Sequence, residues 1–148
     1  MTLKDQTVLL TGAARGIGQA TAVALAERGA HVIGVDLRAG DMAETARRVK
    51  TLGRRFVALE ADVADREAVR RVVDEAVAAG GFSVLVNNAG VLPSGPFAEI
   101  DFSVWARTIE VDLTGLMALT HAALPRLLAQ ARAHIVNIAS IAGKFGAS

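Results

Sequence analysis

The chain has 148 residues, of which 52% are hydrophobic and 21% charged, which is enough for one sizeable core and too little for two ordinary domains. The sequence has sixteen Lys and Arg and fifteen Asp and Glu, and the basic residues are scattered along it, so we expect no nucleic-acid partner. The sequence has no Cys and its three His are far apart without neighbouring carboxylates at ligand spacing, so we also expect no metal site.

No apolar stretch approaches the length that spans a bilayer. The apolar run at residues 8–10 is too short for the hydrophobic part of a secretory signal, and a glycine-rich segment follows it directly. We therefore expect a soluble, cytoplasmic protein that does not associate with membranes.

Short aliphatic and β-branched runs recur along the chain, with amphipathic segments between them. They predict five strands, at residues 7–10, 31–35, 56–59, 82–86 and 135–138. With five Phe, one Trp and no Tyr, the core is built from aliphatic residues, as in parallel strands that are buried on both faces. The alternation predicts an α/β fold with a doubly wound parallel sheet of order 3-2-1-4-5, and a ligand crevice at the carboxyl ends of strands 1 and 4.

Two helices between the strands carry start signals. Asp65 is a predicted N-cap for a helix over 65–79, whose valines and alanines fall on one stripe. Asp41 and Glu44 have the spacing of a capping box for a helix over 41–52.

The last predicted helix is unusually long and covers residues 103–130. Pro125 lies inside it and removes one backbone hydrogen bond, so we expect a bend there.

A glycine-rich segment, T-G-A-A-R-G-I-G, follows the first predicted strand and opens a helix that reaches about Arg28. Glycines at these places let the backbone approach a pyrophosphate at the helix N-terminus, where free N–H groups and the helix dipole favour an anion. The alternative is a turn that only packs the helix on the strand. The candidate binding residues here are Gly12, Arg15, Gly16, Ile17 and Gly18.

Asp36 ends the second predicted strand, about twenty residues after the glycine-rich segment, with Leu37 beside it. A carboxylate there can accept hydrogen bonds from both ribose hydroxyls of an adenosine and would repel a 2′-phosphate, which favours NAD. The competing interpretation is that Arg38 or Arg15 recruits NADP. A solvated strand end without a ligand remains the third possibility.

The spacing of the glycines is G-x-x-x-G-x-G, and four further segments occur in order: D-V at 62–63, N-N-A-G at 87–90, V-D-L-T-G at 111–115 and I-V-N-I-A-S-I-A-G at 135–143. Together they resemble the short-chain dehydrogenase/reductase family. The resemblance covers the whole chain but only the first part of the family's usual domain. It implies one NAD(P)-binding Rossmann-type domain over 1–148, incomplete at its C-terminal end.

The resemblance also implies roles for individual residues. Asp62 would bind the adenine amino group, the Val63 backbone would contact the ring, and Asn87 would brace the sheet by hydrogen bonds. A helix-entry turn is the alternative for the first two. The residues implied on the nicotinamide side are Asn88, Ala89 and Gly90, the last kept small because a Cβ would push the ribose away.

Ser140 matches the family's catalytic serine, whose hydroxyl holds the substrate oxygen; taken alone, a serine at a strand end is a turn residue. Asp112 stands where the family usually has an Asn that positions a water in a proton relay. An ionised Asp accepts hydrogen bonds but does not donate them, so it either holds that water or signals altered activity.

The family's Tyr, with a Lys four residues later, should follow Ser140 by about a dozen residues, whereas this sequence has no Tyr and stops at Ser148. We therefore expect these 148 residues to lack turnover by themselves. We also expect the fifth strand to leave an open sheet edge with uncovered apolar surface.

Two functions follow from these patterns. The first is an NAD(H)-dependent oxidoreductase that interconverts a secondary alcohol and a ketone and acts, at full length, as a homo-oligomer on a small-molecule substrate. The second is a non-catalytic dinucleotide-binding or regulatory module. A structural protein without a cofactor would leave the motifs unexplained.

Overall fold

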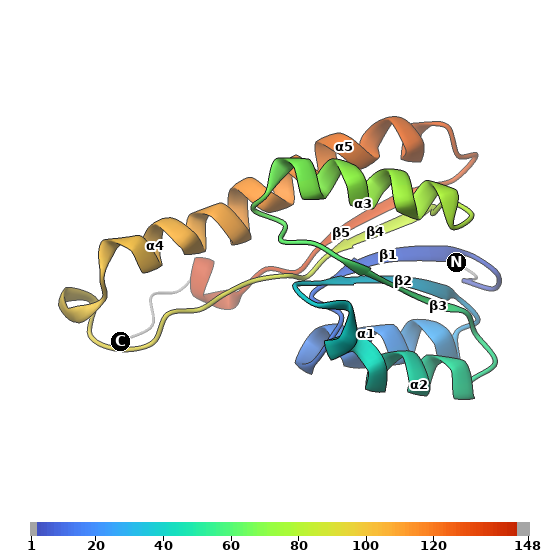
Figure 1. The fold of residues 1–148 in the computed structure, drawn as a ribbon, viewed down its shortest axis with the longest axis horizontal. Helices are drawn as coiled ribbons and strands as arrows, with labels where there is room; N and C mark the ends of the chain where they lie inside the picture. The colour runs from blue at the N-terminus through green and yellow to red at the C-terminus, as the bar shows by residue number, and fades with distance from the viewer. Residues whose placement is uncertain (1–2, 145–148) are drawn as a thin grey trace.

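The computed structural model describes residues 3–144 and arranges five strands in one parallel sheet (Figure 1). The strands are β1 (Thr7–Thr11), β2 (His31–Asp36), β3 (Phe56–Glu60), β4 (Val84–Asn87) and β5 (His134–Asn137). Their order is β3-β2-β1-β4-β5, and every neighbouring pair is parallel. The predicted fold class and strand order are confirmed.

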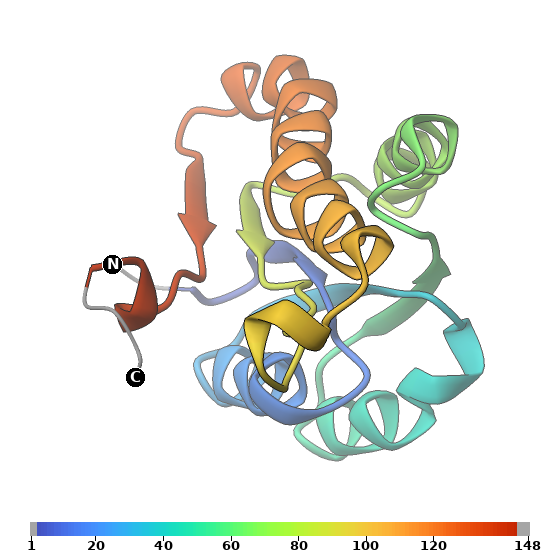
Figure 2. The same cartoon turned by 90° about the vertical axis from the view of Figure 1, so that its left-hand side faces the viewer.

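Helices cover both faces of the sheet (Figures 1 and 2). One face carries α1 (Gly16–Glu27) and α2 (Ala43–Thr51); the other carries α3 (Arg66–Ala78) and α5 (Leu116–Leu128). A long helical run is made of α4 (Phe102–Ile109) and α5, and its α4 part extends past the ends of the strands (Figure 1).

The core is divided between the two faces because side chains alternate along each strand. Val8 and Leu10 of β1 are buried with α1 and α2, whereas Leu9 is buried with α3 and α5. Burial on both faces explains why the strand segments are continuously aliphatic rather than alternating with polar residues.

The ends of the last two strands differ slightly from the prediction. Phe82 is buried, but β4 begins only at Val84, and β5 begins at His134 and ends at Asn137. In both cases buried or aliphatic residues extend past the strand itself, so hydrophobicity alone misplaces the boundary.

The start of α3 follows the prediction. The Asp65 carboxylate accepts hydrogen bonds from the backbone N–H groups of Glu67 and Ala68, at 2.8 and 3.2 Å. These bonds satisfy donors that the first helical turn leaves free, and the cap places α3 directly after the Asp62–Val63 segment.

The predicted capping box of α2 is wrong. A 3-10 turn over Ala39–Met42 precedes the helix, and no side chain caps its N-terminus. The Glu44 carboxylate instead pairs with the guanidinium groups of Arg47 and Arg48, at 2.7 and 2.8 Å, and these hydrogen bonds lower the pKa of Glu44 to about 2. The Glu44 carboxylate therefore forms charge-assisted hydrogen bonds along its own helix, and not the hydrogen bond to a backbone N–H that a capping box requires.

The long helix also departs from expectation, because a π-helical turn over Glu110–Gly115 joins α4 to α5. A Cβ on Gly115 would lie 2.7 Å from the carbonyl oxygen of Val63, so only glycine allows the helix to approach this closely. Pro125 lies inside α5; the bend expected there stays a prediction.

Strand β5 lies at the edge of the sheet (Figure 2). All four of its residues are exposed, including Ile135 and Val136, as expected for an open edge with uncovered apolar surface. Within residues 3–144, none of the helices is long and apolar enough to cross a membrane.

Candidate functional site

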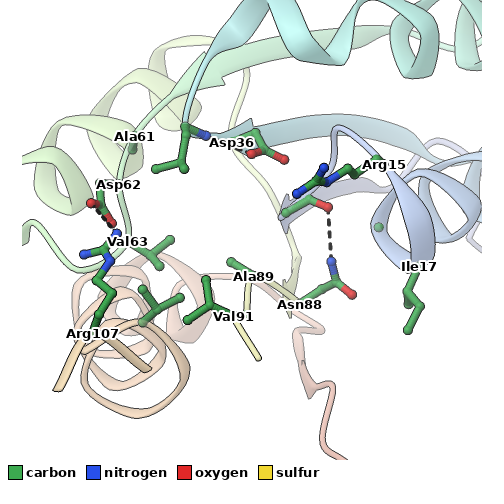
Figure 3. Close-up of a pocket in the computed structure, with 15 residues that line it drawn as sticks. Arg15, Ile17, Asp36, Ala61, Asp62, Val63, Asn88, Ala89, Val91 and Arg107 are labelled. Carbon is green, nitrogen blue, oxygen red and sulfur yellow. Dashed lines mark hydrogen bonds and ion pairs between the residues drawn. The ribbon is translucent and has the colours of Figure 1, made fainter. Parts of the chain in front are cut away.

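A cavity of about 340 Å³ lies at the carboxyl ends of the central strands (Figure 3). All the predicted cofactor-binding residues line it except Gly16, which begins α1. The structure adds four residues that the sequence analysis did not select, namely Ala61, Val91, Arg107 and Val111. The volume is typical of a small-molecule site.

The glycine-rich segment forms one wall of this cavity. Gly12 and Gly16 have φ angles of +66° and +56°, which other residues rarely adopt. A Cβ on Gly18 would lie 1.8 Å from the carbonyl oxygen of Gly12, so the contact between loop and helix requires glycine. No side chain caps the start of α1, so backbone N–H groups are left for an anion in the cavity.

Asn88 ties this wall to the segment that follows β4. Its Nδ2 donates to the carbonyl oxygens of Thr11 and Gly12, at 2.9 and 3.2 Å. In return, the Thr11 hydroxyl oxygen accepts the backbone N–H groups of Asn88 and Ala89, each at 3.0 Å. These bonds hold two walls of the cavity at a fixed separation.

Asp36 presents its carboxylate at the end of β2. Its Oδ2 accepts the backbone N–H of Ala14 at 2.8 Å, and its Oδ1 accepts that of Leu37 at 2.9 Å. Each oxygen keeps a further acceptor position, because a carboxylate oxygen has two lone pairs. The carboxylate is therefore oriented by the protein and can still accept hydrogen bonds from a ligand.

Asp62 and Arg107 face each other on another side of the cavity (Figure 3). Arg107 Nη2 lies 2.6 Å from Asp62 Oδ2, and Asp62 Oδ1 accepts the backbone N–H of Ala64 at 2.9 Å. The sequence gives no signal for Arg107, because its partner Asp62 is 45 positions away and meets it only in the folded chain.

Two polar residues outside the cavity lining support its far side. Asp112, in the π-helical turn, accepts the backbone N–H of Val91 at 2.8 Å. The buried Asn87 donates to Thr120 Oγ1 and Asn137 Oδ1, at 3.0 and 2.9 Å, which links β4 to α5 and β5. The bracing role predicted for Asn87 is thus confirmed, while the contribution of Asp112 to a proton relay stays a prediction.

Ser140 follows β5 and is exposed, and it does not line the cavity. Its backbone carbonyl accepts the N–H of Gly143 at 3.1 Å, which closes a short turn. Gly90 does line the cavity, and a Cβ there would come no closer than 3.4 Å to Asp112 Oδ1. The protein itself therefore leaves room for a Cβ at this position, and the expectation that a ligand keeps Gly90 small stays a prediction.

A parallel sheet of this order, with a glycine-rich turn after β1 and its cavity where the strand order reverses, is a Rossmann-type α/β fold. Residues 6–148 match the family model described as short chain dehydrogenase. The chain belongs to the short-chain dehydrogenase/reductase family.

Individual proteins are also similar to this chain in sequence and in structure. The chain is 41% identical to cis-4-hydroxycyclohexanecarboxylate dehydrogenase of Sinomonas cyclohexanicum, over 96% of this chain and 57% of that protein. Among solved structures, carveol dehydrogenase from Mycobacterium avium in complex with NAD has a TM-score of 0.90 and 34% identity, over 99% of this chain and 58% of the other. NAD⁺-bound xylitol dehydrogenase has a TM-score of 0.93 and 30% identity, over 99% and 57%. The chain thus spans a little over half the length of these relatives.

Proposed function

We propose that the protein is an oxidoreductase that interconverts a secondary alcohol and a ketone with NAD(H) as the hydride carrier. The observation that carries the proposal is the cavity, which brings the glycine-rich wall, the Asp36 carboxylate and the Asn88–Gly90 segment together. The relatives described above support it, since their names are those of alcohol dehydrogenases and two of the structures hold NAD.

Two parts of the dinucleotide would have a counterpart in the cavity. The pyrophosphate fits the free N–H groups at the start of α1, and the adenosine ribose fits the open acceptor positions of Asp36. Ile17 and Leu37 line the cavity with 65% and 59% of their surface exposed, and a bound ligand would cover this apolar surface.

The choice of NAD over NADP rests on Asp36. A carboxylate beside the ribose repels a 2′-phosphate, and one of the competing basic residues, Arg38, is engaged with Asp41 at 3.0 Å. Arg15 lines the cavity and is the remaining residue that favours NADP. We give Asp36 more weight because backbone hydrogen bonds fix its carboxylate, whereas the Arg15 side chain is exposed.

When bound, the nicotinamide would supply a hydride acceptor or donor for the substrate carbon. The Ser140 hydroxyl would donate a hydrogen bond to the substrate oxygen as charge develops on it. Asp112 would hold the Val91 end of the cavity, next to the proposed nicotinamide position. The acid/base that moves the proton would be the family's Tyr, which is not among these 148 residues.

The test is to titrate the purified protein with NADH, following nicotinamide fluorescence, and then to assay a panel of secondary alcohols with NAD⁺. We expect saturable binding, and turnover of at least one alcohol by the full-length enzyme. Binding without turnover of any alcohol or ketone would favour the non-catalytic module. A folded protein that binds no dinucleotide would contradict the proposal altogether.

We further propose that the enzyme is a homo-oligomer. The long helical run exposes large apolar side chains, with Phe102 at 81%, Met117 at 60% and Leu128 at 75%. A second copy of the chain could cover such a surface. Sedimentation of the full-length protein as a monomer at micromolar concentration would contradict this.

A further inference from the structure

The ion pair between Arg107 and Asp62 needs an explanation beyond stability. Its side chains are 39% and 36% exposed, and exposed ion pairs of this kind contribute little to the free energy of folding. Yet the two residues come from different elements, 45 positions apart, and both line the same cavity. Their place suggests that the pair acts on whatever the cavity binds.

The pair fixes the direction of the Asp62 carboxylate. Arg107 occupies one acceptor position on Oδ2, and the backbone N–H of Ala64 occupies one on Oδ1. With both oxygens engaged, the carboxylate cannot rotate freely about its last bond. The two acceptor positions that remain therefore have defined directions.

The helical run that carries Arg107 is itself anchored on both sides of the cavity. Gly115 packs against the carbonyl of Val63, the residue after Asp62, and Asp112 accepts the N–H of Val91 on the opposite side. Arg107 thus reaches Asp62 from a helix whose C-terminal continuation is fixed at two points, which helps it to hold another side chain in place.

We propose that Arg107 is a positioning residue that makes the cavity selective for adenine. The proposal rests on the proposed function, in which Asp62 meets the purine of the dinucleotide. A carboxylate held with free acceptor positions toward the ring favours a 6-amino group, which donates, and disfavours a 6-oxo group, which also accepts. Without Arg107 the carboxylate can turn, and this selectivity falls.

The experiment compares NAD⁺ with its 6-oxo analogue, nicotinamide hypoxanthine dinucleotide, by calorimetric titration of the purified protein. We expect the wild type to bind NAD⁺ about tenfold more tightly than the analogue, the size of one charge-assisted hydrogen bond. Arg107→Met should bring the ratio of the two dissociation constants close to one, and Arg107→Lys should restore much of it.

Arg126→Met is the matched control. Arg126 lies on the same helical run and faces Asp74 of α3 at 4.0 Å, away from the cavity, so its loss should leave the ratio unchanged. If Arg107→Met does not fold, Arg107→Gln is compared with Arg107→Lys, and only Lys should keep the preference.

Four results would overturn the inference. An unchanged ratio in a folded Arg107→Met or Arg107→Gln protein would show that Arg107 does not orient Asp62. Tighter binding of both dinucleotides by the variant would show that Arg107 blocks the purine position. A wild type that binds NAD⁺ without preferring it over the analogue overturns the inference alone, whereas a wild type that binds neither overturns the proposed function as well.

Discussion

Asp36 ends β2, whereas Asp62 and Asn88 follow the ends of β3 and β4, and each uses part of its hydrogen-bonding capacity on the protein backbone. This use is what orients them, because a polar side chain without such partners would sample several rotamers at the cavity edge. The acceptor positions that remain on the two carboxylates are the ones available to a ligand. The sequence identified these residues but could not show how they are held.

Ser140 has a proposed catalytic role although it does not line the cavity, so it needs a direct test. In the full-length enzyme, Ser140→Ala should lower turnover by about a hundredfold, because it removes one donor to the developing oxyanion. Dinucleotide affinity should stay nearly unchanged, since the residue does not line the cavity. Steady-state kinetics and a melting curve give both quantities.

Ser83→Ala is the control for this measurement. Ser83 precedes β4, at the amino end of that strand and outside the cavity lining, where its hydroxyl donates to Gln6. Its loss should affect stability and not turnover. Should Ser140→Ala retain full turnover, or lose activity only by unfolding, Ser140 would be a turn residue without a catalytic role.

Asp112 offers a test of the support behind the cavity. Asp112→Asn retains an oxygen that can accept the Val91 N–H, so dinucleotide affinity should remain near that of the wild type. Asp112→Ala removes the acceptor and should weaken binding by about fivefold, equivalent to roughly 1 kcal/mol for one hydrogen bond. Titration of the three proteins with NADH measures this, and equal affinity of all three would rule out the supporting role.

At the scale of the elements, α3 begins beside the Asp62–Val63 segment and depends on its cap. Asp65→Ala should lower the free energy of unfolding by about 1 kcal/mol, because the N–H groups of Glu67 and Ala68 lose their acceptor. Glu75→Ala, on the exposed face of the same helix, should change it by less than about 0.5 kcal/mol. Urea denaturation that gave equal losses for both variants would contradict the capping role.

The strands and their order could be predicted because aliphatic runs, glycines and right-handed crossovers restrict an alternating chain to few topologies. The N-cap at Asp65 could also be predicted, since it depends on residues that are close in sequence. Local signals fail where another partner competes, as at Glu44, whose carboxylate binds two arginines of its own helix instead of capping it.

The π-helical turn and the Arg107–Asp62 pair could not be predicted for a different reason. Both depend on how the long helical run meets the Asp62–Val63 segment in the folded chain, including the close approach of Gly115 to Val63. A regular helical period passes through residues 110–115 without any break in the sequence pattern. Only the packed arrangement shows that the run changes pitch there.

In the molecule as a whole, the cavity lies where the strand order reverses, between β1 and β4. Chains leave β1 and β4 toward opposite faces of the sheet, so a crevice opens at the carboxyl ends of these strands, as in other doubly wound folds. The two helical layers secure the sheet, and hydrogen bonds between Asn88 and the segment after β1 fix the opening. The site is therefore a property of the topology, and its selectivity is a property of the side chains at its rim.

The most direct test of the account is calorimetric titration of the wild type and Asp36→Ala with NADH and with NADPH. The wild type should bind NADH more tightly, and Asp36→Ala should lose about tenfold in NADH affinity while its NADPH affinity is retained or improved. Asp74→Ala, an exposed carboxylate on α3, should leave both affinities unchanged. Tighter binding of NADPH by the wild type, or a gap between the two cofactors that persists in Asp36→Ala, would contradict the account.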